Sequence, residues 1–301
     1  MADKQPLISE GEQLAKILDE LQNESAVKDV AGWESGFANL SRALDGVRPG
    51  LHLIIGPPGV GKTSFAKQLL DQVAMRNNAA GVFFSFAESK KELRIKTLAR
   101  LSDMDNREIR RGSAYLLHWY GVPRLSGNQP SDISPSWERL KRAAEQAQSW
   151  LNSIYLVDAG ANTTVASIAE QIDDIKNIRK SAQLMVVLDD CQRFGEITES
   201  LDARLPIVVE QLQSLAMNLG LPLLAIWPDL SGETKTEPHA WAERVASADV
   251  IMVLENDSAR TKPLSEPNRP VTLHIVKNRG GEKGKLAFDF YPAFAKFTEA
   301  A

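Results

Sequence analysis

The sequence predicts an α/β fold in which a mostly parallel, twisted sheet is flanked by helices and continued by antiparallel strands near the C-terminus. Two observations carry this prediction. Short apolar runs alternate with helical periods over most of the chain, and strand patterns follow one another without helices after about Val250. The 301 residues, 43% of them hydrophobic and 25% charged, are enough for one large core with appendages.

The N-terminal segment predicts a short amphipathic helix over residues 9–22. Ser9 and Glu12 have the spacing of a capping box, and four apolar residues share one face. These four are Leu14, Ile17, Leu18 and Leu21. The next stretch is polar, so the apolar face either folds back on its own domain or finds a partner elsewhere. We therefore divide the chain into an N-terminal arm, residues 1–30, and one domain over residues 31–301.

The apolar runs that follow predict strands buried on both faces, as in a parallel sheet covered by helices on both sides. These strands are residues 51–55, 82–86, 154–157, 184–188 and 222–226. The predicted helices are one that ends at about Asn77 and those over 89–101, 164–180 and 206–218. The C-terminal strands are predicted over 250–254, 271–276, 285–290 and 295–297. Turn-forming residues such as RGGEKG separate them, so they should form hairpins that extend the same sheet.

The composition excludes several classes of protein. A formal net charge of -4 argues against coating nucleic acid by bulk charge, so DNA binding requires a local site. The single cysteine, Cys191, excludes an internal disulfide, and the histidines lack metal-ligand spacing. The histidines are His52, His118, His239 and His274. Neither a run of about 18 apolar residues nor a secretory signal occurs, which predicts a cytoplasmic protein with no membrane partner.

Residues 56–64, GPPGVGKTS, match the pattern G-x-x-x-x-G-K-[ST] between a predicted strand and a predicted helix. In this context the glycines let backbone N–H groups face the β-phosphate of a nucleotide at the helix N-terminus. Lys62 is expected to neutralise the β- and γ-phosphate oxygens, and Thr63 to place its hydroxyl on Mg²⁺. The predicted cofactors are therefore ATP and Mg²⁺. The predicted nucleotide-binding residues are Gly56, Pro57, Pro58, Gly59, Val60, Gly61, Lys62, Thr63 and Ser64.

Acidic residues complete the predicted site. Asp189 and Asp190 directly follow a buried apolar run, and parallel strands end at the ligand-binding edge of such a sheet. Asp189 is the expected second metal ligand beside Thr63. A carboxylate must also activate water, and two candidates are present: Glu88, just beyond a predicted strand, and Asp190.

Several segments over most of residues 30–297, taken in order, resemble the ATPase domain of the DnaB-type replicative helicases, which has a RecA-like fold. ESGFANLSRALDGVRPGLHLIIGPPGVGKTSFA resembles the family's opening stretch through the phosphate loop, and VFFSFAESKKELRIK resembles its S-L-E-M-S segment. VVLDDCQRF resembles its D-Y-L-Q strand end, SADVIMVLEND its D-A-D-V strand, and IVKNRGGEKGKLAFDF its K-x-R-x-G-x-x-G hairpin. The order of these segments carries the resemblance.

The resemblance implies a RecA-like ATPase domain over residues 31–301 that assembles into a ring, most often a hexamer. It also implies that Lys277 and Arg279 act in trans on the nucleotide of the neighbouring subunit, where such an arginine contributes about 10³ to 10⁵ in rate. The residues alone also allow a solvated basic turn in a hairpin. The helix over 9–22 takes the place of the linker helix that docks on the adjacent subunit. The predicted catalytic residues are then Lys62, Glu88, Asp189, Asp190, Lys277 and Arg279.

The chain departs from the family's pattern around the expected reaction centre. A gapless alignment puts Ala87 at the position of the family's glutamate, with Glu88 one residue later. Either Glu88 reaches in through a bulge, or Asp190 replaces it, or hydrolysis is slow. At the position of the family's γ-phosphate sensor stand three other residues: Trp227, Pro228 and Asp229.

Two segments bear on DNA contact. Residues 113–131 form a longer connection than the family's and hold side chains that either stack on bases or pack on a domain. These are Tyr115, His118, Trp119, Tyr120 and Arg124. The loop after Asp189 has Arg193 and Arg204 against three acids, which is weakly basic for phosphate contact. The N-terminal domain of the replicative members is not expected in this chain.

Two functions fit these predictions. The first is an ATP-hydrolysing motor, a helicase or translocase, that acts on single-stranded DNA as a ring of identical subunits. The alternative is a RecA-like regulatory ATPase whose nucleotide-dependent assembly controls a protein partner without unwinding. A small-molecule kinase is disfavoured because the sequence shows no acceptor site. Polarity on the strand, DNA versus RNA, and the pathway do not follow from the sequence.

Overall fold

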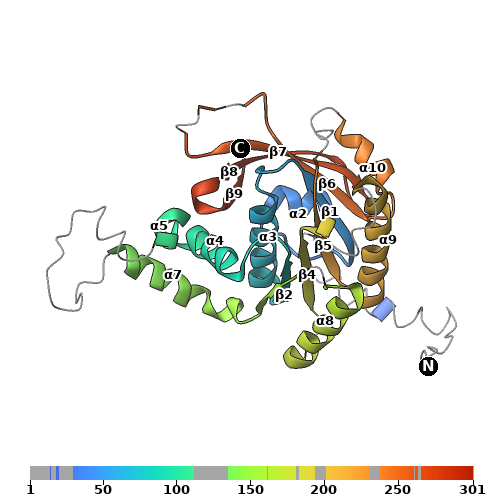
Figure 1. Ribbon diagram of the computed structural model, residues 1–301, viewed down its shortest axis with the longest axis horizontal. Helices are drawn as coiled ribbons and strands as arrows, with labels where there is room; N and C mark the ends of the chain where they lie inside the picture. The colour runs from blue at the N-terminus through green and yellow to red at the C-terminus, as the bar shows by residue number, and fades with distance from the viewer. Residues whose placement is uncertain are drawn as a thin grey trace.

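One nine-stranded sheet organises the chain in the computed structural model (Figure 1). The structure describes residues 14, 18, 19, 30–111, 135–160, 162–180, 183–193, 201–230, 237–260, 262–263 and 266–300. The strand order is β3-β2-β4-β5-β1-β6-β7-β8-β9. The first six strands in this order pair in parallel, and β7, β8 and β9 are antiparallel. This confirms the predicted parallel sheet and its antiparallel C-terminal extension.

The strands lie where the apolar runs predict them. The parallel strands are β1 (Gly50–Gly56), β2 (Ala80–Ser85), β3 (Ile154–Asp158), β4 (Leu184–Asp189), β5 (Pro222–Pro228) and β6 (Val250–Asn256). The antiparallel strands are β7 (Arg269–Asn278), β8 (Gly284–Tyr291) and β9 (Lys296–Glu299). Every residue of β1, β2, β4 and β5 is buried, as expected for strands with helices on both faces.

Helices cover both faces of the sheet and divide the core in two. One face packs on α8 (Val165–Arg179), α9 (Leu201–Leu219) and α10 (Trp241–Arg244), and the other packs on α2 (Ala38–Leu44), α3 (Lys62–Asn77) and α4 (Lys90–Ser102). Because successive strand residues point to opposite faces, Leu53 and Ile55 join the first core and Ile54 joins the second. Outside α4 lie α5 (Asn106–Arg111) and α7 (Pro135–Leu151) (Figure 1).

A cluster of phenylalanine rings holds the antiparallel extension against the helix that follows the glycine-rich loop. Phe65 in the first turn of α3 lies with its ring centroid 5.2 Å from that of Phe297 in β9. Phe297 stacks on Phe290 of β8 at 4.4 Å. The C-terminal strands therefore brace the start of α3, which is where the predicted phosphate site begins.

The structure adds to the predicted elements and corrects one boundary. The helices α2, α5, α7 and α10 were not predicted, and α9 begins at Leu201, with Pro206 inside it rather than at its start. Proline inside a helix removes its own N–H donor and crowds the carbonyl four residues earlier, but Pro206 lies near the start of α9, and the buried Leu205 beside it keeps this part of the helix on the core. Among the described residues, none of the helices combines the length and the apolar character needed to cross a membrane.

Most of the N-terminal arm lies outside the described residues, as does the connection over 113–131. Of the helix predicted over 9–22, the structure describes Leu14, Leu18 and Asp19, all in helical conformation. Leu14 is 57% exposed and Leu18 is 56% exposed. These two apolar side chains therefore have no extensive packing against the rest of the described chain.

Candidate active site

The glycine-rich loop joins the end of β1 to the start of α3, at the edge of the sheet where the parallel strands end. Gly59 and Gly61 have φ angles of 79° and 103°, which favour glycine. A Cβ on Gly56 would lie 2.3 Å from the carbonyl oxygen of Leu254, so only glycine permits this approach of two strands. No side chain caps the N-terminus of α3. Its first N–H groups therefore face an anion-binding position.

Lys62 is nearly buried within this loop, with 9% of its surface exposed. Its Nζ donates to the carbonyl oxygens of Gly56 at 2.8 Å and Pro57 at 2.9 Å. Burial lowers the pKa of Lys62, whereas Asp189, Asp190 and other acids nearby oppose this shift. A phosphate bound in the loop would add a negative charge next to the Lys62 ammonium and so favour its protonated form.

Asp189 is buried at the end of β4 and faces the start of α3. A hydrogen bond from the Thr63 side chain reaches its carboxylate, while Oδ2 is buried and has no hydrogen-bond partner within the described part of the chain. Burial raises the pKa of Asp189 to about 6, against the effect of the Thr63 hydrogen bond. An unpaired buried carboxylate beside a hydroxyl is a donor set that suits Mg²⁺.

Asp190 is held differently from its neighbour. Its Oδ1 accepts from the backbone N–H of Gln192 at 3.2 Å, and its Oδ2 accepts from the Gln192 side chain at 2.6 Å. Burial raises the pKa of Asp190, and the hydrogen bonds from Gln192 act against this shift. Both carboxylate oxygens are thus engaged locally, which makes Asp190 the weaker candidate for activating water.

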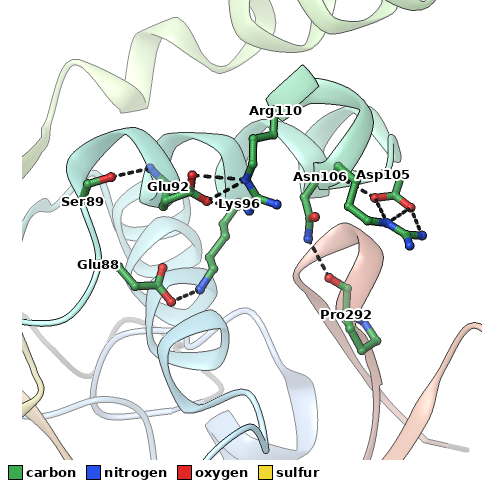
Figure 2. Close-up of polar contacts among 9 residues, drawn as sticks. Glu88, Ser89, Glu92, Lys96, Asp105, Asn106, Arg110 and Pro292 are labelled. Atoms are coloured by element: carbon green, nitrogen blue, oxygen red, sulfur yellow. Dashed lines mark hydrogen bonds and ion pairs between the residues drawn. The ribbon is translucent and has the colours of Figure 1, made fainter. Parts of the chain in front are cut away.

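Glu88 reaches toward the site although it stands one residue after the position of the family's glutamate. It lies beyond the end of β2, and its N–H donates to Ser85 Oγ at 3.0 Å. Its Oε1 pairs with Lys96 Nζ at 2.5 Å (Figure 2), and its Oε2 is buried without a hydrogen-bond partner among the described residues. Ala87 is exposed instead. The turn after the strand therefore restores the direction that a one-residue shift would reverse.

Glu88 and Asp189 share one electrostatic environment. The carboxylate of Glu88 helps to raise the pKa of Asp189, and the ammonium of Lys96 acts in the opposite direction. Lys96 was not singled out from the sequence, because its partner lies eight residues away across a helix start. Lys96 pairs directly with Glu88, and its charge also acts on Asp189.

The helix that carries Lys96 is fixed by a network of polar contacts (Figure 2). Ser89 caps α4 by accepting from the Glu92 N–H at 3.3 Å, and Arg110 of α5 pairs with Glu92 at 2.6 Å. Asn106 donates to the carbonyl oxygen of Pro292 at 2.9 Å, which joins α5 to the segment between β8 and β9. The start of α4, and hence Glu88, is held from both sides.

A buried charge network fixes α4 to α3. Asp71 of α3 is paired with Lys67 on its own helix and with Arg100 of α4. Its Oδ2 also accepts from Thr97 Oγ1 at 2.9 Å. All four side chains are buried. This network ties the helix of the phosphate loop to the helix that carries Lys96.

The end of β5 places a third acid beside the loop. Asp229 is 2% exposed, and its N–H donates to the carbonyl oxygen of Gly56 at 2.8 Å. Its carboxylate is among the charges that oppose the lowered pKa of Lys62. Trp227, in contrast, belongs to the hydrophobic core. Of the three residues at the expected sensor position, Asp229 is the one whose charge acts on the loop.

Lys277 and Arg279 lie toward the end of the sheet where the parallel strands begin, whereas the phosphate loop lies where they end. Strand β7 runs antiparallel to β6, and Lys277 pairs with Ile251 at the start of β6. Ile251 in turn pairs with Leu53 of β1, three residues before Gly56, where the loop begins. Arg279 bonds to Asp249, whose N–H donates to the carbonyl oxygen of Leu51, five residues before Gly56. At roughly 3.3 Å per residue, these offsets along the strands are about 10 Å for Lys277 and about 17 Å for Arg279. The side chain of Lys277 donates to the carbonyl oxygen of Ala246 and that of Arg279 pairs with Asp249, both just before β6 and away from the loop of the same chain. The structure therefore does not bring these two together with the other predicted catalytic residues.

A cavity of about 850 Å³ opens on the same edge of the sheet as the phosphate loop. Its walls come from α5, the end of β6, the start of β7 and the 3₁₀ turn Pro292–Phe294. Phe290, two residues before Pro292, has its ring where a Cβ on Gly61 would lie 2.9 Å away. The loop and the cavity wall are thus linked through the segment Phe290 to Pro292, although no loop residue lines the cavity.

Comparison with known proteins gives one family and several relatives. The family described as DnaB-like helicase C terminal domain matches residues 32–299. The replicative DNA helicase DnaB of Haemophilus influenzae is 22% identical over 303 residues, which cover 95% of this chain and 58% of that protein. DnaB of Geobacillus stearothermophilus is 24% identical over 282 residues, which cover 90% and 57%. The chain spans less than two thirds of the length of these relatives.

Two solved structures share the fold. One is described by its title as an ATPase domain and matches with a TM-score of 0.76 and 20% identity, over 98% of this chain and all of that one. "The Structure Of A DnaB-Like Replicative Helicase And Its Interactions With Primase" matches with a TM-score of 0.73 and 20% identity, over 98% of this chain and 69% of that one. At this identity the two likenesses establish the RecA-like fold.

Proposed function

Because the chain belongs to the DnaB-like helicase C-terminal domain family, we propose that it is an ATP-hydrolysing motor that acts on single-stranded DNA as a ring of identical subunits. One observation carries the proposal. The phosphate loop and its acids lie where the parallel strands end, and the basic pair Lys277 and Arg279 lies near the end where these strands begin. Each chain therefore presents two halves of a site that only a neighbouring copy completes.

The half at the phosphate loop binds and positions the nucleotide. Backbone N–H groups of the loop and the ammonium of Lys62 hold the phosphates. Thr63 and Asp189 would hold Mg²⁺, which when bound supplies positive charge to the phosphate oxygens. The buried Oε2 of Glu88 has no hydrogen-bond partner among the described residues. It accepts a hydrogen bond from the attacking water, which orients the water, and takes up its proton as general base.

The half at the other end of these strands stabilises charge in the transition state. The Arg279 side chain is 62% exposed and pairs with Asp249 through Nη1, so its other N–H donors, unpaired within the described part of the chain, can reach a phosphate presented by a neighbour. Lys277 lies two residues earlier, near the end of β7, and Arg279 directly follows that strand. Their cationic groups would neutralise the charge that develops on the transferred phosphoryl group.

We propose that the cavity between α5 and the start of β7 is the binding site for the base and ribose of ATP. Its volume of about 850 Å³ falls in the range of small-molecule sites. Phe294 on its wall offers a ring, and Arg269 and Lys262 offer charge. This assignment keeps the phosphates at Gly61 and the nucleoside on the side of the C-terminal strands.

A ring also needs a contact between subunits, and the N-terminal helix is the proposed one. Leu14 and Leu18 are exposed on the described part of that helix. A groove of about 770 Å³ runs between α8 and α9 and is lined in part by Ala169, Ile207 and Leu215. Ile207 is itself 49% exposed. We propose that the leucine face of one copy docks in this groove of the next.

The proposal is tested by ATP turnover with and without single-stranded DNA, by strand separation on a forked duplex, and by native mass. We expect a ring, turnover that DNA stimulates, and separation of the fork. A ring that hydrolyses ATP without DNA stimulation or unwinding would favour the regulatory ATPase instead. A protein that stays monomeric with and without ATP and does not hydrolyse it would contradict both functions.

A further inference from the structure

Asp249 lies at the centre of a set of contacts that the nucleotide-binding half of the site does not use. It precedes β6 and is only 15% exposed at its side chain, while the Arg279 side chain that pairs with it is 62% exposed. Arg279 Nη1 lies 2.9 Å from Asp249 Oδ1. The backbone N–H of Arg279 also donates to the carbonyl oxygen of Asp249 at 3.0 Å. Both ends of the arginine are thus attached to one residue.

The Asp249 carboxylate is itself fixed by the sheet and by a helix. Its Oδ2 accepts from the backbone N–H of Leu51 at 3.0 Å and from Gln213 Nε2 of α9 at 2.9 Å. A Cβ on Gly50 would lie 2.5 Å from this oxygen, and the φ of 130° at Gly50 also favours glycine there. The backbone of β1 therefore leaves room for this carboxylate and holds it rigidly.

The turn that follows Arg279 is fastened from the other side. Asn278 Nδ2 donates to the carbonyl oxygen of Ala43 at 2.9 Å, and the N–H of Glu282 donates to the same oxygen at 2.9 Å. The Arg48 guanidinium donates to the carbonyl oxygen of Gly280. Because the backbone around Arg279 is fixed in this way, the direction of its side chain depends mainly on the contact with Asp249.

We propose that Asp249 is a positioning residue for Arg279, and that it aims the guanidinium at the nucleotide of the neighbouring subunit. The inference rests on the proposed action of Arg279 in trans. One nitrogen of the guanidinium pairs with Asp249, and the exposed guanidinium has further N–H donors that can bind a phosphate. A charged group held in advance needs no reorganisation when transition-state charge develops. Asp249 acts only through Arg279 and touches no reacting atom.

A double-mutant cycle tests this role in the full-length, assembled protein. Asp249→Asn removes the charge of the carboxylate and keeps its size. We expect kcat to fall by about 10²-fold, the scale of a misplaced catalytic group, with unchanged affinity for ATP. Arg279→Ala should lower kcat by at least about 10³-fold. In the Arg279→Ala background, Asp249→Asn should cause no further loss.

The outcomes separate the inference from the function on which it rests. Glu145→Gln, which removes an exposed ion pair with Lys141 on α7, is the matched control and should leave kcat unchanged. If Asp249→Asn lowers kcat equally in both backgrounds, or weakens ATP binding, then Asp249 has only a structural role and the inference is wrong. If Arg279→Ala itself leaves kcat unchanged in an intact ring, the proposed action in trans fails first.

Discussion

Three acidic side chains at the carboxyl edge of the sheet are distinguished by how their oxygens are used. Asp189 has one oxygen without a partner in the described chain, Glu88 likewise has one, and both oxygens of Asp190 are engaged by Gln192. Asp189 lies against Thr63 and suits the metal, whereas Glu88 lies next to Lys96 and suits the water. The contacts thus favour Glu88 over Asp190 for water activation, the role that the sequence left open between these two.

Substitution of the two candidates for water activation distinguishes them. We expect Glu88→Gln to lower kcat for ATP hydrolysis by about 10²- to 10⁴-fold, because a positioned base contributes on that scale. Asp190→Asn should lower kcat much less, because the amide still accepts one hydrogen bond from Gln192. Steady-state hydrolysis of both variants measures this, and a larger loss in Asp190→Asn would reverse the assignment.

The titration of Asp189 makes the stability of the metal-free protein depend on pH. Burial holds the pKa of Asp189 at about 6, above the value near 3.9 of an unfolded aspartate. Between these values the folded state binds the proton more tightly, so this group's contribution to stability is lost as pH rises. The loss is about 3 kcal/mol once the pH exceeds the folded pKa.

The measurement is the free energy of unfolding in chelator across this range of pH. Asp189→Asn should lack this decline, since its side chain carries no proton that the pH removes. The difference between the two proteins should therefore grow from about pH 4 to about pH 6. Parallel curves for the wild type and the variant would show that Asp189 is not held protonated.

At the scale of elements, the strands were predictable because their signal is local. The runs at β1, β4 and β5 are continuous and apolar, which is typical of strands covered on both faces. The helix α7 was missed although Leu140, Ala143 and Ala147 form its buried face. Two of these are alanines, so the apolar stripe is weak. A helix start at Pro135 was the available signal.

The charge network between α3 and α4 was beyond sequence analysis, because its members are separated by a strand and a turn. Asp71→Asn leaves the buried cations Lys67 and Arg100 without their carboxylate partner. We expect it to lower the free energy of unfolding by about 3 to 5 kcal/mol. Urea unfolding measures this. Glu34→Gln removes the exposed pair with Arg76 and should cost less than about 1 kcal/mol. Equal effects would show that the network does not hold the helices.

At the scale of the whole molecule, the predicted fold and the phosphate loop follow from the sequence, whereas the completed site does not. The loop has a strict pattern of neighbouring residues, but Arg279 is about 17 Å along the strand direction from Gly56. Lys96, which pairs with Glu88, is not part of the S-L-E-M-S motif itself, and Asp249, although it lies in the segment that resembles D-A-D-V, shows its link to Arg279 only through its contacts. If the site is shared between two copies of the chain, one sequence reveals each half but not how the two halves come together.

The most direct test of the central claim mixes two inactive proteins. Lys62→Ala destroys the nucleotide half of the site and keeps Arg279, while Arg279→Ala does the reverse. If the site is shared between neighbours, mixed rings contain interfaces at which both intact halves meet. ATP hydrolysis should then reappear in the mixture, although neither variant alone hydrolyses ATP. Mixed rings that assemble, bind ATP and remain inactive would contradict a site completed in trans.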